Sequence, residues 1–349
     1  MSSLRLSETD IVGSVRQRVS LYAIISDVQY RQMSNGGDMV TFKMLDKECS
    51  RGCTSFVVTP ELKEKLEKLK GKVCHIMFDV KPYDKGEDGI SCILYEIDEA
   101  IVNEEDGLDF ATFVPCVEHL ELYAEWLNNL LATYSRDTIY GDIAIRLLNK
   151  YWDTFSVLPA ASSYHHDIRG GLLQHSVSVA MISMGMYDKY RLIYGDDLIN
   201  PALLAAGALI HDIGKCFELE DTGVGKAQYS VSSITENHTT RGILEVDRIA
   251  NELGYTGYKE VAELEHLIAS HHGRVDTGAI MEPTSPEAMI VSVADDLDAR
   301  INRVFKWLGA EHNIAKSEWY SGGLVKMSKG LSYAEAVQSY RDFITSIGL

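Results

Sequence analysis

The stretch ALIHDIGK, residues 208–215, decides how the rest of the sequence is interpreted. Apolar residues lead into it from Pro201 at helical spacing, and it ends on adjacent His211 and Asp212, followed by Gly214. Glycine commonly ends a helix by letting the chain turn, so we predict a helix that ends at this pair. An imidazole and a carboxylate side by side can bind one metal ion, while the second carboxylate oxygen reaches another.

Histidines are concentrated around this pair: eight of the eleven lie between His165 and His272. Asp295 follows an apolar run, where a lone carboxylate is unfavourable unless it is paired or bound to metal. Each histidine by itself is compatible with an ordinary core or surface role. Together, a set spread over several helices favours a metal centre inside a helical bundle. The candidate ligands are His175, His211, Asp212, His238, His271, His272 and Asp295.

Four segments carry a resemblance to a known family. They are SSYHHDIRGGLLQHSVSV (162–179), LLAAGALIHDIGKCFEL (203–219), LEHLIASHHGRV (264–275) and SPEAMIVSVADDLDARI (285–301). They resemble the HD-domain metal-dependent phosphohydrolase superfamily and, more narrowly, the YhaM-type 3′-to-5′ exoribonucleases, which join an N-terminal OB-fold to an HD domain. The resemblance implies a first metal held by His175, His211, Asp212 and Asp295. It also implies that Asp212 bridges to a second metal, held by His238 and by His271 or His272.

The implied cofactors are two divalent metal ions, which would activate water for attack on a phosphodiester. Histidine-rich ligation favours Mn, with Fe, Co or Ni as further candidates, because imidazole is a softer donor than carboxylate or water. Asp212, Lys215 and Arg274 are the predicted catalytic residues, and the two cations are expected to contact phosphate oxygens, although each is also compatible with a solvated surface charge. His165 and His166 precede the Gly-Gly turn and are predicted to bind substrate or support the ligands.

Several positions depart from this pattern or flank it. Gln174 stands where the family often has Glu, so an extra carboxylate near the metals is missing. The segment after Arg303 does not match the exoribonucleases. Asp298, one turn after Asp295, is expected to orient another ligand, whereas Asp296 is expected to face solvent and His266 to have a packing role.

The first hundred residues predict a different architecture. Period-two patterns and turn residues predict strands over 19–30, 39–45, 55–59, 73–83 and 90–98, with an amphipathic helix over 59–71. Five strands with one helix between the third and fourth is the order of an OB-fold barrel, a coarse pattern that other small barrels share. Single-strand binding would need aromatic residues to stack on bases, with positive charge nearby. The candidates are Tyr22, Phe42, Tyr30 and Tyr83 with Arg16, Arg18, Arg31 and Lys43, and the competing interpretation is that such aromatics fill the barrel core.

From Leu108 onward apolar residues recur at helical spacing, up to a last predicted helix over 332–347. The predicted fold class is α+β multidomain: a five-stranded OB-fold-like β-barrel over 1–107, then an all-helical HD domain over 108–349. The acidic stretch 98–109 is the predicted linker.

Composition limits the possible partners and compartment. The 349 residues carry a formal net charge of −18, so attraction to nucleic acid must be local. No apolar run approaches the roughly 20 residues of a membrane span, and the N-terminus MSSLRLSETD does not resemble a signal peptide, so we expect a cytoplasmic protein without membrane partners. The six cysteines lack paired spacing and are expected to be reduced thiols.

The predicted function is a metal-dependent phosphodiesterase acting on single-stranded RNA or DNA, with a 3′-to-5′ exoribonuclease as the leading form. One alternative is a nucleotide or cyclic-nucleotide phosphohydrolase in which the barrel serves assembly into a homo-oligomer. The other is a non-catalytic single-strand-binding module with a structural HD domain.

Overall fold

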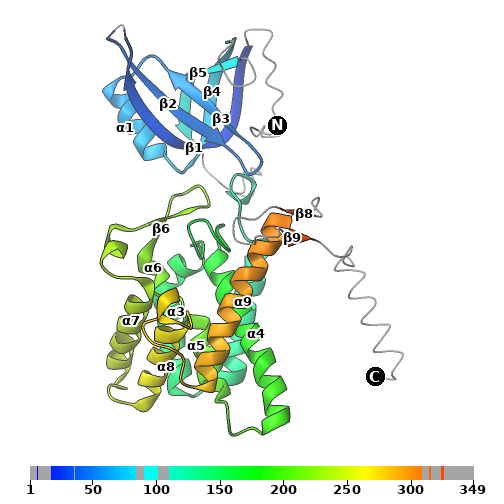
Figure 1. Cartoon of the computed structure of the whole chain (residues 1–349). Coiled ribbons are helices and arrows are strands. Elements are labelled where there is room, and N and C mark those ends of the chain that lie inside the picture. Colours follow the sequence, from blue (N-terminus) through cyan, green and yellow to red (C-terminus); the bar gives the residue numbers. More distant parts are fainter. Residues whose placement is uncertain are drawn as a thin grey trace. The chain divides into compact units, whose positions relative to one another are not determined.

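The computed structural model describes residues 6, 17–34, 36–83, 90–100, 110–308, 314–315 and 324–325. A β-barrel comes first along the chain and a helical region follows (Figure 1). The predicted last helix over 332–347 lies outside the described residues, as does the predicted linker apart from residues 98–100.

The barrel has the predicted strand order. Its strands are β1 (Gln17–Gln32), β2 (Asp38–Leu45), β3 (Ser50–Ser55), β4 (Val73–Pro82) and β5 (Ile90–Glu99), with α1 (Pro60–Leu69) between β3 and β4. They close in the order β1-β2-β3-β5-β4, and β3 pairs parallel with β5 whereas the other pairs are antiparallel. This topology confirms the OB-fold-like barrel.

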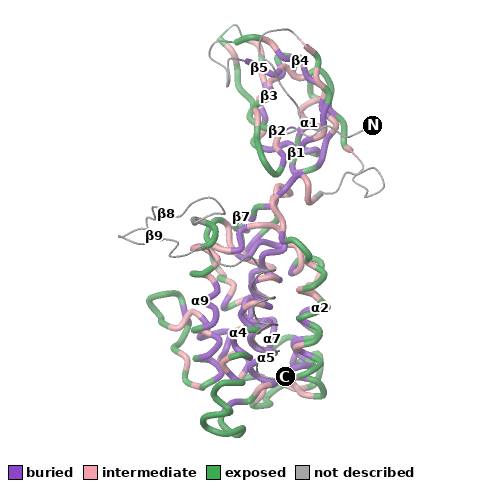
Figure 2. The backbone as a smooth tube through the Cα atoms, turned by 90° about the vertical axis from the view of Figure 1, so that its right-hand side faces the viewer, coloured by how far each residue is buried: buried purple, intermediate pink, exposed green. Residues whose placement is uncertain are grey.

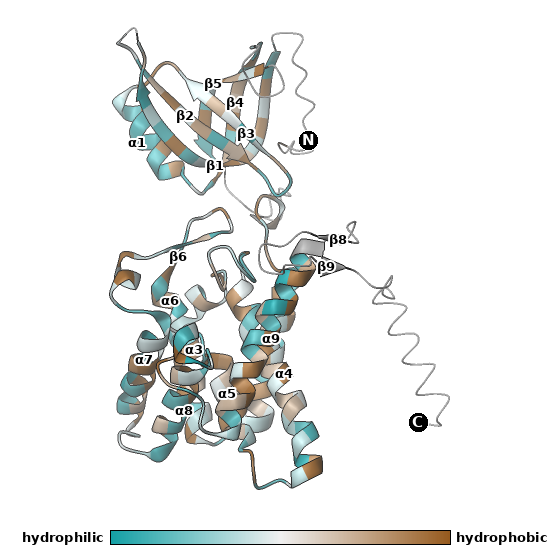
Figure 3. Ribbon diagram, in the orientation of Figure 1, coloured by the Kyte–Doolittle hydropathy of each residue, from teal (hydrophilic) through white to brown (hydrophobic). Residues whose placement is uncertain are grey.

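The helix α1 begins where the sequence predicts. The Thr59 side chain accepts a hydrogen bond from the backbone N–H of Leu62 at 3.2 Å, and Pro60 occupies the first helical turn, where its missing N–H costs nothing. The helix is mostly hydrophilic (Figure 3), and its buried residues, Leu66 and Leu69, belong to the barrel core.

The predicted position of the third strand is wrong by several residues. The expected strand over 55–59 is replaced by Ser50–Ser55, and Phe56 and Val57 are 52% and 71% exposed. The turn after β2 explains the difference: the Asp46 carboxylate accepts hydrogen bonds from the N–H groups of Glu48 and Cys49, both at 2.9 Å. This tight turn starts β3 at once, in register from Leu45 opposite Ser50.

The helical region begins with the 3₁₀ turn η3 (Phe110–Thr112). Its larger helices are α2 (Leu120–Leu130), which continues into a π-helical turn (Leu131–Ser135), α3 (Ile139–Phe155), α4 (Gly171–Tyr194), α5 (Pro201–Ile210), α7 (His238–Leu253), α8 (Lys259–Ser270) and α9 (Pro286–Leu308). Between α5 and α7 lie the short α6 (Lys215–Glu218), the strands β6 (Leu219–Asp221) and β7 (Ala227–Tyr229) and a 3₁₀ turn (Val231–Ile234). A further 3₁₀ turn (Val275–Thr277) follows α8. Among the described helices, none is both long and apolar enough to cross a bilayer.

Residues 299–349 form a unit separate from residues 1–298. In its described part, α9 runs on to Leu308, and β8 (Ile314–Ala315) pairs antiparallel with β9 (Leu324–Val325).

The centre of the helical region is α5. Every residue from Ala202 to Ile210 is buried (Figure 2). The helix contacts α3, α4 and α8. Asn200 caps its start by accepting hydrogen bonds from the N–H groups of Ala202 and Leu203. A helix that is apolar on all sides is stable only inside a core, so its last residues deliver His211 and Asp212 into the interior.

Gly214 serves a purpose other than the predicted one. The helix α5 ends at Ile210, and Gly214 has ordinary right-handed helical angles (φ −63°), so no left-handed turn is needed there. A Cβ at this position would instead lie 1.9 Å from the carbonyl oxygen of His238 and 2.8 Å from the backbone nitrogen of Gly242. Glycine is required because the turn after α5 packs directly against the backbone at the start of α7.

We therefore expect Gly214→Ala to lower the free energy of unfolding by about 1–3 kcal/mol or more, because backbone atoms must move to admit the methyl group. Gly185→Ala is the matched control: a Cβ there meets nothing within 4 Å, and alanine in a helix interior should add about 0.5–1 kcal/mol. Urea denaturation in a chelating buffer measures both without any contribution from metal binding. Equal stability of the two variants would contradict this packing role.

Candidate metal centre

Five elements bring the predicted ligands together. His175 lies in the first turns of α4, His211 and Asp212 follow α5, His238 begins α7, His271 and His272 follow α8, and Asp295 lies in α9. The interior position of this set is unusual for polar residues. His175, His211, Asp212 and His271 are at most 1% exposed, and Asp295 is 8% exposed.

Asp212 is the hub of the arrangement. Its Oδ2 lies 3.4 Å from Nε2 of both His175 and His211. Its Oδ1 lies 3.6 Å from Nε2 of His238 and 3.7 Å from Nε2 of His271. The two oxygens of one carboxylate therefore face two different groups of imidazoles.

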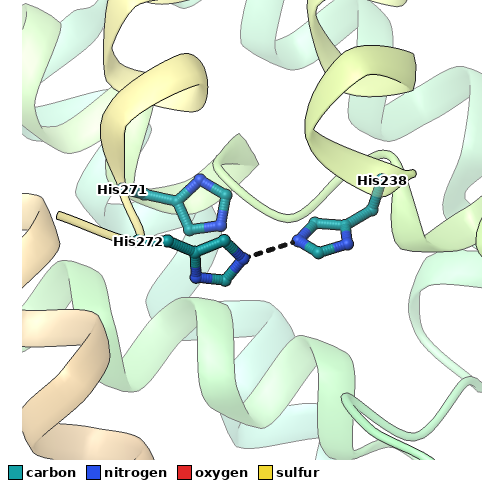
Figure 4. Close-up of side chains that lie close together, drawn as sticks. All are labelled: His238, His271 and His272. Atoms are coloured by element: carbon teal, nitrogen blue, oxygen red, sulfur yellow. Dashed lines mark hydrogen bonds between the residues drawn. The ribbon is translucent and has the colours of Figure 1, made fainter. Parts of the chain in front are cut away.

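Asp295 and His272 extend the two groups. Asp295 Oδ1 lies 3.1 Å from His175 Nε2 and 3.9 Å from His211 Nε2, and Asp295 Oδ2 lies 3.7 Å from His272 Nδ1. Nε2 of His272 is 3.0 Å from Nε2 of His238 (Figure 4). The ligand atoms of His175, His211 and Asp212 lie within 4.8 Å of one another, as do those of His238, His271 and His272.

The far nitrogen of each central histidine is held by an acceptor. Nδ1 of His211 donates to the Ala208 carbonyl and Nδ1 of His271 to the Ile268 carbonyl, both at 2.7 Å. Nδ1 of His175 donates to Asp298 at 2.7 Å. These contacts fix the rings so that Nε2 faces the centre, which is the usual outer support of a metal-binding histidine.

His238 has the same kind of support from a residue that the sequence did not reveal. Its Nδ1 donates to Glu218 Oε2 at 2.8 Å, and its backbone N–H donates to Glu218 Oε1 at 3.2 Å. Glu218 ends α6, and the paired strands β6 and β7 fold the chain back so that positions twenty residues apart meet. No spacing rule predicts such a pair; its one signal is an acidic residue close behind the His-Asp turn.

Four inward-facing ligand atoms of the described residues lack a hydrogen-bond partner, and a bound metal ion would supply a partner. In the described part of the chain, Nε2 of His175, His211 and His271 and Oδ1 of Asp212 are buried without a hydrogen-bond partner. An unpartnered buried polar group costs about 1–3 kcal/mol, and these four converge on one place. Three imidazole nitrogens around a carboxylate form a donor set that suits divalent transition metals.

The charges of the site agree with cation binding. Burial raises the pKa of Asp212, but Lys215, His211 and His175 outweigh it and hold that pKa well below its usual range. For Asp295, burial is likewise outweighed, chiefly by His175 and His211, so its pKa is also lowered. Both carboxylates are therefore ionised inside the bundle.

The pKa values of His175 and His271 are shifted in opposite directions. Burial lowers the pKa of His175, but the carboxylates Asp212, Asp295 and Asp298 outweigh it and raise that pKa well above its usual value. Burial, with His272 and His211 nearby, holds the pKa of His271 well below its usual value. The negative field that draws a proton to His175 also favours a divalent cation, which competes with that proton.

The predicted substrate residues take different positions. Lys215 is 7% exposed, with Nζ 2.6 Å from Asp212 Oδ2, whereas the side chain of Arg274 is 73% exposed and pairs with Asp276 at 2.8 Å. The His165 ring lies beside His175, with centroids 5.2 Å apart, and burial lowers the pKa of His165 to about 2. His166 is buried and forms a hydrogen bond with Asp298, on the side of His175 that faces away from the other ligands.

The flanking residues largely follow expectation. Asp298 orients His175 as expected, and Asp296 is exposed. His266 points to Thr284, whose N–H donates to its Nε2 at 3.0 Å, away from the ligand groups. Gln174 also faces away from the metal ligands, toward His166 and Tyr123. Its substitution for Glu therefore changes an outer contact and not the number of inward carboxylates.

One barrel prediction needs correction. Phe42 is 2% exposed and belongs to the barrel core, so it cannot stack on a base. On an alternating strand its neighbour Lys43 faces out, and the sequence does not say which of the two faces is inside. Tyr22 is half-buried, with its ring 5.1 Å from that of His75, while Tyr30 and Tyr83 are 38% and 52% exposed.

A buried His-Asp pair at the end of a core helix, with histidines and an aspartate from neighbouring helices, is the kind of donor set that metal-dependent hydrolases use. Residues 172–300 match the family model described as HD domain.

Curated relatives extend the similarity to most of the chain. It is 28% identical over 293 residues to the 3′-5′ exoribonuclease YhaM of Geobacillus sp. strain WCH70, which covers 83% of this chain and 85% of that protein. The same identity holds over 287 residues with the YhaM of Listeria monocytogenes serotype 4b, covering 78% and 88%. It holds again over 299 residues with that of Listeria innocua serovar 6a, covering 84% and 89%.

The hub position of Asp212 yields a metal-binding prediction. Asp212→Asn keeps the size of the side chain but removes the charge that both imidazole groups share, so we expect it to lose bound metal. In the parent protein, Mn²⁺ at about 100 times its Kd should raise the free energy of unfolding by about 2.7 kcal/mol, and the variant should lack this gain.

Elemental analysis and thermal melts with and without Mn²⁺ measure both effects. Asp296→Asn, at an exposed neighbour of Asp295, is the control and should behave as the parent. Full metal content in Asp212→Asn would contradict the assignment of Asp212 as a metal ligand.

Proposed function

We propose that this protein is a metal-dependent phosphodiesterase that degrades single-stranded RNA from its 3′ end. The observation that carries the proposal is the set of buried, unpartnered atoms that converge around Asp212 in an HD domain. The relatives that bear the name 3′-5′ exoribonuclease support the substrate class, because their similarity covers 83% and 78% of this chain, well beyond the HD-domain match alone. In this proposal the barrel comprises residues 1–107, the hydrolase domain comprises residues 108–349, and the protein works in the cytoplasm.

The proposed ligands divide between two cations. The first is assigned to His175, His211, Asp212 and Asp295, and the second to Asp212, His238 and His271 or His272. The imidazole-rich donor set favours Mn, with Fe, Co or Ni as other transition metals. Divalent cations bound here would lower the pKa of a coordinated water and neutralise phosphate charge, which is the chemistry that phosphodiester hydrolysis needs.

Two positively charged side chains and one histidine complete the proposed site. Lys215 is positioned beside Asp212, and an ammonium has no lone pair with which to bind metal, so its proposed role is contact with a phosphate oxygen. Arg274 is the proposed second phosphate contact, because its exposed guanidinium lies two residues after His272. His165, neutral through burial, is a proposed hydrogen-bonding partner of the substrate.

The barrel is the proposed single-strand platform. Base stacking is assigned to Tyr22 and to the exposed Tyr30 and Tyr83. The guanidinium of Arg18 lies 3.5 Å from the ring centroid of exposed Tyr95, which adds a cationic and aromatic pair on the barrel surface. The net charge of −18 makes such local features necessary for nucleic-acid binding.

The experiment is incubation of the purified full chain with Mn²⁺ and end-labelled single-stranded RNA, matched DNA, and a panel of nucleotides and cyclic nucleotides. A ladder of mononucleotide steps from the 3′ end of RNA is the expected result. Turnover of nucleotides alone would favour a nucleotide phosphohydrolase with an assembly barrel, and binding without turnover a non-catalytic module. A ladder on DNA alone would overturn the RNA assignment.

Lys215 tests the division between metal ligands and phosphate contacts. Lys215→Met keeps most of the buried stem and removes the charge, so we expect kcat/KM on RNA to fall roughly 10- to 150-fold, the worth of a charge-assisted hydrogen bond of about 1.5–3 kcal/mol. Metal content should stay at the parent level. Lys259→Met, at an exposed lysine of α8, is the control. Activity within about twofold of the parent, or lost metal, would contradict this role.

A further inference from the structure

A series of buried and partly buried hydrogen bonds runs behind His175. Nε2 of Gln174 donates to the Tyr123 hydroxyl at 2.9 Å, and Oε1 of Gln174 lies 2.8 Å from Nδ1 of His166. Nε2 of His166 lies 2.8 Å from Asp298 Oδ2, the same oxygen that accepts from His175 Nδ1 at 2.7 Å. This series of hydrogen bonds, the relay from Tyr123 through Gln174, His166 and Asp298, links helix α2 to the metal-ligand candidate His175.

Each group of the relay contacts the next through specific atoms. Because the Gln174 amide nitrogen is used on Tyr123, its oxygen faces His166. The Asp298 carboxylate faces Nε2 of His166 and Nδ1 of His175 with the same oxygen. His166 therefore bridges Gln174 and Asp298 through its two ring nitrogens, and the second oxygen of Asp298 accepts from the Ser178 hydroxyl.

The backbone of His166 is held in a conformation that it would not choose locally. Its φ of 43° lies in the left-handed region, which residues other than glycine adopt uncommonly and which histidine tolerates better than most. The His166 carbonyl accepts from the Ala160 N–H at 2.9 Å, and a Cβ on Gly171 would lie 1.9 Å from that carbonyl oxygen. Strain that the surrounding structure maintains is typical of residues with a functional task.

We propose that His166 and Gln174 are positioning residues that set the affinity of the His175 side of the centre for divalent metal. The proposal rests on the metal centre of the proposed function. His166 keeps Asp298 in place and saturated with donors, so that Asp298 orients the His175 ring with Nε2 toward Asp212. Gln174 in turn fixes His166 without adding a charge, because an amide oxygen replaces a carboxylate at this position.

The test uses metal affinity as its readout, measured by calorimetric titration of the chelator-stripped full chain with Mn²⁺. His166→Asn tolerates the left-handed backbone but its side chain is too short to reach Asp298, so binding should weaken about 10- to 100-fold. Gln174→Glu keeps an acceptor for His166 and should bind within about threefold of the parent, whereas Gln174→Leu, of similar size without an acceptor, should weaken binding about tenfold. His266→Asn, at a histidine bonded to Thr284, is the control and should leave affinity unchanged.

Each outcome decides one point. Thermal melts in chelator verify that every variant is folded before titration. A parent protein that binds no Mn²⁺ would overturn the proposed function itself. A parent that binds, together with His166→Asn or Gln174→Leu of parental affinity, would overturn the positioning role and leave the metal centre standing. Equal losses in Gln174→Glu and Gln174→Leu would also contradict the relay, since they would reflect packing and not the acceptor.

Discussion

Asp212 is an ionised carboxylate that is 1% exposed at the end of a fully buried helix, and the architecture of the helical region depends on how that charge is compensated. Removing a carboxylate from water costs several kcal/mol unless it is paired and hydrogen-bonded. Lys215 supplies one positive partner at 2.6 Å, and imidazoles from three other elements converge within 3.4–3.7 Å of its two oxygens. A single lysine leaves most of this lone-pair capacity unused, which is why the site is suited to divalent cations.

This constraint explains why several helices end where they do. Ligands from α5, α7 and α8 come from the ends of helices, where a side chain reaches the interior without disturbing the packing along the helix sides. The start of α7 must approach the turn after α5 closely enough to present His238, and Gly214 is the residue that permits this approach. Two outer carboxylates orient ligand histidines in the same way: Asp298 accepts from Nδ1 of His175, and Glu218 accepts from Nδ1 of His238. The inner charges are held by an outer ring of fixed acceptors.

Much of the barrel and of the ligand set could be predicted from the sequence, and the errors have physical causes. Alternation located β2 to within a residue but could not say which of its two faces lies inside, because both faces of a barrel strand carry some apolar residues. Phe42 was therefore predicted to bind bases although it lies in the barrel core. The β-branched run after Ser55 suggested a strand, yet the Asx turn at Asp46 had already set the register. Glycine at position 214 suggested a turn. Glycine is in fact required there because the backbone at the start of α7 packs against it.

Local patterns determined what recurs along the chain: the order of strands and helices, the apolar core helix, and the identity of residues with metal-binding chemistry. They did so because periodicity and residue type are properties of short segments. Only the tertiary structure decided which oxygen of Asp212 faces which imidazole, that Glu218 supports His238, and that Gln174 belongs to an outer relay through His166. Those relations depend on the approach of separate helices to within a few ångströms, and that distance is set by the packing of the whole core.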